Sequence, residues 1–186
     1  MKKNVSIHIG ELHVSQTPAV IYTLLGSCVA VCLFDPTQGI GGMNHILLPG
    51  IAGSKMDDAT SRYAHNAIEM LINSLMRLGA KQRNLIAKAF GGAHLLQTIS
   101  DHRGVGRHLS EFVLGFLAEK KIRIESYDLG GADVRKIYFH TDTGMVLLKR
   151  SPMQGFEQFI DREQATVRQL YQKIRKAEKI LPVLVS

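Results

Sequence analysis

The sequence predicts a single α/β domain of the α+β kind, in which mixed, mostly antiparallel β-sheet layers are covered by packed helices. Three observations predict it. Short apolar runs of strand length are punctuated by glycine and proline, other stretches have the spacing of amphipathic helices, and no linker or repeat divides the chain. With 186 residues, 45% of them hydrophobic, the chain is long enough to bury one substantial core.

The N-terminal part of the chain is predicted to form strands that fold back on one another. Residues 5–34 read as strands, punctuated at Gly10 and Pro18. The composition of residues 35–39 predicts a turn, and residues 41–48 read as a returning strand. Because the turn is short, the two runs that it joins are expected to pair antiparallel.

The rest of the chain alternates helix and strand. The first helical stripe stops before Gly79, which stands where a C-cap glycine is expected. The last two strands are predicted to form a hairpin folded at residues 142–144. In order, the predicted elements are a helix around 64–75, a strand at 85–90, a helix around 109–117, a strand at 122–129, the hairpin at 137–149 and a long basic helix at 156–180.

We therefore assign residues 1–155 to one domain and residues 156–186 to a basic helical extension packed on the same domain. The net charge is +7, and much of the excess lies in this extension. A solvated helix face is the simpler explanation, since no nucleic-acid motif accompanies the charge, and attraction to an acidic partner surface is the functional alternative. We expect no nucleic-acid partner. The basic residues concerned are Arg168, Lys173, Arg175, Lys176 and Lys179.

Several classes of protein are disfavoured. No apolar run approaches the ~18–20 residues of a membrane span. The N-terminus reaches no apolar signal segment, so we expect an uncleaved, cytoplasmic protein with no membrane insertion. Cys28 and Cys32 would share a strand face about 13 Å apart, beyond disulfide reach. The irregular spacing of the histidines favours loop and surface roles over a metal site. The histidines in question are His94, His102, His108 and His140.

The segment Gly26-Ser27-Cys28 interrupts a run that otherwise reads as buried strand. A cysteine nucleophile works as the thiolate and needs an adjacent base. His45 is a candidate base, because the returning strand runs back toward Cys28. Gly26 lets the backbone kink, which would expose the sulfur and free N–H groups near Ser27 and Cys28 for an oxyanion hole.

The alternative is purely structural. Cysteine is among the residue types most often buried, and a histidine on a strand is usually a hydrogen-bonded side chain. We interpret Cys32 in this way, as a core thiol, because its neighbours Val31 and Leu33 offer nothing to activate it. The glycine pairs 91–92 and 130–131 are expected to make turns, with close approach to a ligand as the alternative.

The two segments Thr23-Leu-Leu-Gly-Ser-Cys-Val-Ala-Val31 and Gly41-Gly-Met-Asn-His-Ile-Leu-Leu-Pro49 resemble the chemoreceptor glutamine deamidase family, CheD. Because several further blocks recur in the family's order, the resemblance is specific and spans roughly residues 5 to 150. These blocks are Arg62-Tyr-Ala64, Leu78-Gly-Ala80, Lys88-Ala-Phe-Gly-Gly-Ala93, Asp128-Leu-Gly-Gly131, Arg135-Lys-Ile137 and Thr143-Gly144.

The resemblance implies a protein-glutamine glutaminase that converts selected glutamines of methyl-accepting chemotaxis receptors into glutamates and releases ammonia. It implies Cys28 as nucleophile, His45 as base and Thr23 as third member, with Gly26 and Ser27 shaping the oxyanion site. Neither a cofactor nor a metal is implied. The substrate partner would be the cytoplasmic helices of the receptors. The alternative from another class is a regulatory module that binds a CheC-type chemotaxis phosphatase.

Overall fold

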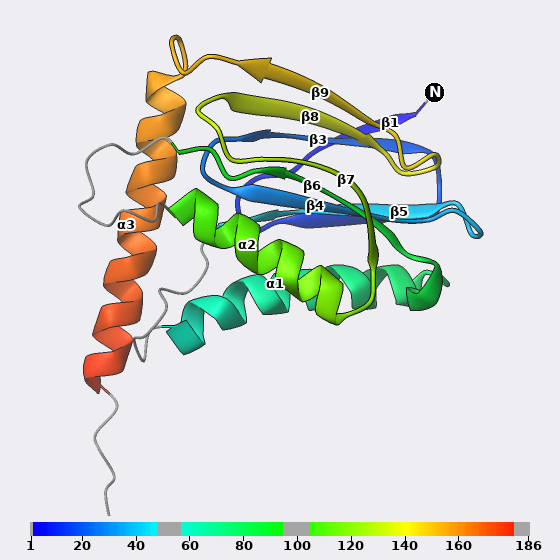
Figure 1. Ribbon diagram of the computed structural model, residues 1–186, viewed down its shortest axis with the longest axis horizontal. Helices are drawn as coiled ribbons and strands as arrows, with labels where there is room; N and C mark the ends of the chain where they lie inside the picture. Colours follow the sequence, from blue (N-terminus) through cyan, green and yellow to red (C-terminus); the bar gives the residue numbers. More distant parts are fainter. Residues whose placement is uncertain (1, 48–56, 95–104, 181–186) are drawn as a thin grey trace, which may run out of the picture.

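The computed structural model describes residues 2–47, 57–94 and 105–180. Two stacked sheets and a layer of helices make up the body of the molecule, and one long helix stands across the ends of the strands (Figure 1). The elements are β1 (Lys3–Ser6), β2 (Leu12–Ser15), β3 (Ala19–Leu25), β4 (Val29–Asp35), β5 (Ile40–Ile46), α1 (Asp57–Arg77), a 3-10 turn (Gln82–Asn84), β6 (Ile86–Gly91), α2 (Val105–Glu119), β7 (Arg123–Leu129), β8 (Val134–His140), β9 (Val146–Ser151) and α3 (Glu157–Ile180).

Both sheets are mixed and mostly antiparallel, which confirms the predicted fold class. The four-stranded sheet has the order β1-β3-β8-β9, with only β1 and β3 parallel. The five-stranded sheet has the order β2-β5-β4-β6-β7, with only β6 and β7 parallel. The predicted antiparallel pair around the turn at 35–39 is β4 with β5, and the predicted terminal hairpin is β8 with β9.

Burial follows from the layering. One apolar core lies between α1, α2 and the five-stranded sheet, and a second lies between the two sheets. Because β4 and β5 belong to the middle layer, both of their faces are covered, and almost every residue of these strands is buried. The amphipathic helix α1 ends as predicted, with Gly79 at φ +103° and its N–H bonded to Met76 O at 2.9 Å.

The structure corrects our interpretation of residues 20–34 as one interrupted strand run. β3 belongs to the four-stranded sheet and β4 to the five-stranded sheet, so the chain crosses from one sheet to the other at residues 26–28. Both strands are apolar and of similar length, so the sequence pattern does not separate them. Gly26-Ser27-Cys28 is therefore a crossover between layers.

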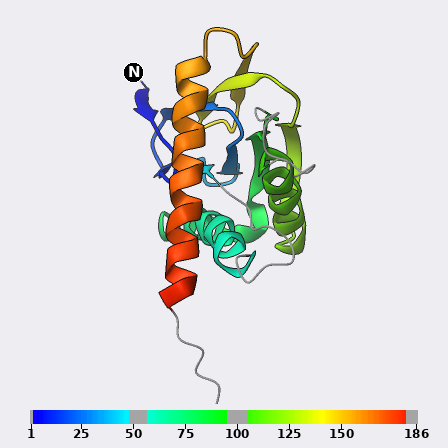
Figure 2. The same ribbon diagram turned by 90° about the vertical axis from the view of Figure 1, so that its left-hand side faces the viewer.

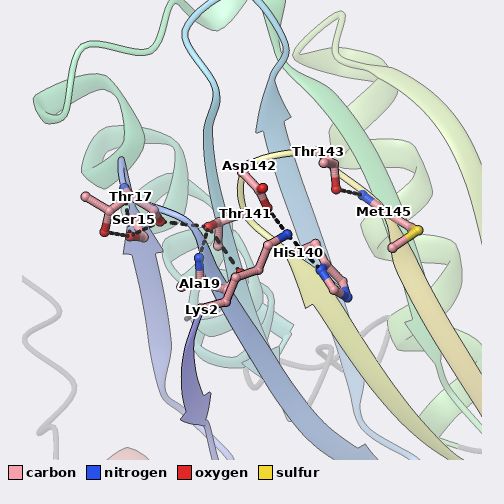
Figure 3. A network of polar contacts seen from close by, with 9 residues as sticks. All are labelled: Lys2, Ser15, Thr17, Ala19, His140, Thr141, Asp142, Thr143 and Met145. Carbon is pink, nitrogen blue, oxygen red and sulfur yellow. Dashed lines mark hydrogen bonds and ion pairs between the residues drawn. The ribbon is translucent and has the colours of Figure 1, made fainter.

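Far from α3, a polar network ties the N-terminus to the β8–β9 turn (Figure 3). The Thr141 hydroxyl accepts from Ala19 N–H at 3.0 Å and lies 3.1 Å from the Thr17 carbonyl oxygen. Lys2 pairs with Asp142 at 2.7 Å. His140, one of the four histidines considered above, lies beside Lys2 in this network and faces no metal-binding cluster within the described ranges.

In the turned view, the helix α3 runs in front of the sheets, along the height of the molecule (Figure 2). Phe159 and Ile160 of its first turn, with Phe156 directly before it, pack against a small apolar cluster that includes Ala93 and Val134. Within the described part of the chain, no helix is long and apolar enough to span a membrane. His102 lies outside the described residues. The same holds for the basic side chains of the C-terminal extension, Arg168, Lys173, Arg175, Lys176 and Lys179.

Candidate active site

The crossover loop is held in place by the end of β6, at Gly91, and by the two residues that follow it. The N–H of Gly92 donates to Cys28 O at 2.7 Å, and the N–H of Ala93 donates to Gly26 O at 2.9 Å. Gly91 has φ +114°, and a Cβ there would overlap the carbonyl oxygen of Cys28. Glycines 91 and 92 therefore allow the backbone of β6 to approach the loop that carries Cys28, a role that the sequence pattern alone did not separate from a simple turn.

Both cysteines are free and buried. Burial raises the pKa of the Cys28 thiol well above its ordinary value, and the nearby Glu163 carboxylate raises it further. Burial also raises the pKa of Cys32, an effect that Lys88 only partly opposes. In the described arrangement both groups are therefore neutral thiols at neutral pH.

Thr23 and His45 meet in the buried space between the sheets. The Thr23 hydroxyl donates to the carbonyl oxygen of Ile7 at 2.7 Å, and its oxygen lies 2.8 Å from His45 Nδ1. A hydroxyl has only one proton, and the carbonyl of Ile7 can only accept. Thr23 must therefore accept from Nδ1–H of His45, which leaves Nε2 of the neutral imidazole unprotonated and able to act as a base.

The side chain of His45 faces the same interlayer space as Cys28. His45 is paired with Ala30, two residues after Cys28, so the side chains of residues 28, 30 and 45 face the space between the sheets. Nε2 of His45 is buried and has no hydrogen-bond partner among the described residues. Burial lowers the pKa of His45 to about 4, and His8 adds to the effect.

The backbone at Ser27 and Cys28 binds one oxygen of a carboxylate. Oε1 of Glu163, from α3, accepts from Ser27 N–H at 2.6 Å and from Cys28 N–H at 3.1 Å, and it also accepts from the Ser27 hydroxyl. Two adjacent backbone donors thus converge on one oxygen beside the thiol, which is the arrangement of an oxyanion hole. Of the predicted residues, Gly26, Ser27 and Cys28 form the crossover loop, and Thr23 is hydrogen-bonded to His45. The carboxylate at the loop belongs to Glu163, which nothing in the sequence pattern indicated.

A cavity of about 830 Å³ opens beside this site, between α3 and the four-stranded sheet. Its lining includes Thr23, His45 and Glu163 of the site, together with Phe159 and Lys136. No group of three or more metal-binding side chains occurs within residues 2–47, 57–94 and 105–180. The chemistry available here is that of a buried thiol, an imidazole and two backbone donors.

Comparison with known proteins decides the family. The family model described as "CheD chemotactic sensory transduction" matches residues 47–150. The chain belongs to the CheD family. The match begins after His45 and ends before α3, so it covers neither the Thr23, Cys28 and His45 group nor Glu163.

Curated CheD relatives cover more of the chain. It is 41% identical over 157 residues to "Probable chemoreceptor glutamine deamidase CheD" of Thiobacillus denitrificans, covering 83% of this chain and 77% of that protein. It is 43% identical over 146 residues to the protein of that name from Trichlorobacter lovleyi, covering 78% of this chain and 89% of that protein. Among solved structures, the chain is similar to the Bacillus licheniformis hypothetical protein YfiH, with 16% identity and a TM-score of 0.41. The similarity covers 62% of this chain and 49% of that chain.

Proposed function

We propose that this protein is a chemoreceptor glutamine deamidase, which hydrolyses glutamine side chains on the cytoplasmic helices of chemotaxis receptors to glutamate. The observation that carries the proposal is the convergence of Ser27 N–H and Cys28 N–H on one oxygen next to a buried thiol. Membership of the CheD family and the names of the relatives support the choice of substrate.

In the proposed reaction His45 Nε2 takes the thiol proton as Cys28 Sγ attacks Cδ of the glutamine carboxamide. The former carbonyl oxygen becomes an oxyanion and accepts hydrogen bonds from the N–H groups of Ser27 and Cys28. Loss of one such donor typically costs about 10²–10³ in rate. His45 then protonates the departing nitrogen, ammonia leaves, and a thioester remains.

In the second half of the reaction His45 takes a proton from water, whose oxygen attacks the thioester carbon. The S–C bond breaks, Cys28 regains its proton, and a glutamate side chain is released. Thr23 keeps Nδ1 of His45 protonated throughout, so Nε2 remains the nitrogen that exchanges protons with Cys28 and the substrate.

The proposal is tested by mass spectrometry of receptor cytoplasmic fragments incubated with the protein. Wild type should raise the mass of selected glutamine peptides by about 1 Da, the difference between NH₂ and OH in this hydrolysis. Cys28→Ala should abolish the change, whereas Cys32→Ala, the matched variant at the other buried thiol, should retain it. Equal activity of wild type and Cys28→Ala would refute the proposal.

The substrate is expected to be a glutamine on a helix surface, because the site lies under a helix and beside a cavity of about 830 Å³. Free glutamine should therefore be hydrolysed poorly.

The surface around this cavity is also our proposed binding site for a CheC-type phosphatase. The variant Cys28→Ala should keep that binding while it loses ammonia release.

A further inference from the structure

The oxyanion hole is occupied by a side chain of the protein itself. Glu163 lies on α3, 135 residues beyond Cys28, and is only 2% exposed. Its neighbours along the helix, Asp161, Arg162 and Ala165, are exposed. One carboxylate oxygen takes all three hydrogen bonds from Ser27 and Cys28, and the other is buried without a hydrogen-bond partner among the described residues. The side chain is thus directed into the site.

This contact does not assist the nucleophile. The negative charge of Glu163 and its contact with the thiol both raise the pKa of Cys28, whereas a thiol prepared for attack needs a lower one. Burying a carboxylate is costly unless its charge is compensated. Here two backbone N–H groups and a hydroxyl supply the compensation, and Phe156, Phe159 and Ile160 anchor the helix on the apolar cluster beside the loop.

The chemistry of Glu163 matches the product of the proposed reaction. Hydrolysis of a helix-borne glutamine leaves a helix-borne glutamate, with a carboxylate oxygen at the donors that held the oxyanion. We infer that α3 occupies the substrate position as a built-in, product-like ligand, and that a receptor helix must displace it before the site can act. This inference rests on the proposed function and deepens it, because α3 then shows which features a substrate helix should have.

The arrangement of α3 also defines the expected substrate. Counted from Glu163, the buried Ile160 lies three positions toward the N-terminus, and the partly buried Phe159 and Phe156 lie four and seven positions away, Phe156 directly before α3. These positions share one helix face. A receptor helix that fits the same surface should carry apolar residues at these offsets from its target glutamine.

The decisive experiment converts the internal ligand into a substrate. In Glu163→Gln the carboxamide should lie where the carboxylate lies, with Cys28 beside it. Sγ bonds to Cδ, the C–N bond breaks with release of ammonia, and water then cleaves the thioester to regenerate the thiol and leave glutamate at position 163. The purified full chain is incubated, digested with trypsin and sequenced by tandem mass spectrometry, which distinguishes position 163 from Gln164 in the same peptide.

Position 163 should become glutamate with a first-order rate that does not depend on protein concentration, as expected for an intramolecular reaction. Gln158 and Gln164 of the same helix should remain unchanged and serve as internal controls. The double variant Glu163→Gln/Cys28→Ala should keep glutamine at 163. If position 163 stays glutamine while the same preparation deamidates receptor fragments, the inference about α3 is refuted and the proposed function stands. If neither substrate reacts, the proposed function fails, and the inference fails with it.

A second measurement does not depend on turnover. Cys28 alkylation by iodoacetamide, quantified by mass spectrometry at that residue, should be faster in Glu163→Ala than in wild type. The expected increase is about tenfold or more, because the substitution removes both the negative charge that raises the pKa of the thiol and the side chain that occupies the site. Asp161→Asn, which removes an exposed carboxylate from the same turn, should alkylate at the wild-type rate. Equal rates in wild type and Glu163→Ala would refute the blocking role of α3.

Discussion

Protonation of His45 should make the stability of the protein depend on pH in a defined window. The pKa of His45 is about 4 in the folded protein, because burial and His8 disfavour the imidazolium, against 6.5 for an ordinary histidine. Between these values the unfolded chain binds a proton that the folded protein does not. Lowering the pH from 6.5 toward 4 therefore favours unfolding, and below about 4 this contribution stops growing.

The magnitude follows from the two pKa values. For one site, the difference in free energy of unfolding between pH 7 and pH 4.5 is about 2 kcal/mol. At an m-value of about 2 kcal/mol per molar urea this corresponds to a midpoint shift of about 1 M. Urea unfolding followed by circular dichroism at several pH values measures the shift in wild type and in His45→Gln, whose side chain stays neutral and can still bond to Thr23.

Other titrating groups are common to both proteins, so the difference between the two curves isolates His45. Wild type should lose about 2 kcal/mol more than His45→Gln between pH 7 and pH 4.5. His8→Gln should keep most of the pH dependence, because burial is the larger cause of the shift. Parallel curves for wild type and His45→Gln over this range would show that His45 is not held neutral by burial.

Two further substitutions test how the site is shaped. Gly91→Ala should destabilise the protein by more than Gly39→Ala in thermal unfolding. Both glycines have positive φ, so backbone strain costs about 1–2 kcal/mol at either position. Only at Gly91 would the added Cβ also overlap the carbonyl oxygen of Cys28. Thr23→Val should lower kcat for receptor deamidation by at least about tenfold and change its pH profile, since His45 Nδ1–H loses its acceptor. Thr23→Ser, which keeps the hydroxyl, should have the wild-type kcat and pH profile. A normal pH profile in Thr23→Val would contradict the assignment of Thr23 as a positioning residue.

Much of the site was predictable because its residues are close in sequence and on paired strands. β4 and β5 are joined by one short turn, so their antiparallel pairing sets His45 opposite Ala30, two residues after Cys28. Gly26 marked the backbone break. The donor and acceptor roles of Thr23 and His45 needed the structure, because only the hydrogen bond to Ile7 fixes which nitrogen carries the proton.

The remaining parts depend on contacts between distant segments. The division into two sheets was not predictable from residues 20–34, since strands on either side of the crossover have the same apolar character. Glu163 is one acidic residue in a long charged helix, and nothing local distinguishes it from a solvated side chain. Only the packing of Phe159 and Ile160 directs it toward Ser27.

The bond between Thr23 and His45 joins strand β3 of one sheet to strand β5 of the other. In the proposed mechanism, proton transfer at Cys28 therefore depends on the spacing of two layers that meet through side chains such as Met43 and Phe139. Substitutions that change the volume of this interlayer core should misalign the imidazole before they unfold the protein. The turnover rate should then respond to smaller changes in the spacing of the two sheets than the melting temperature does.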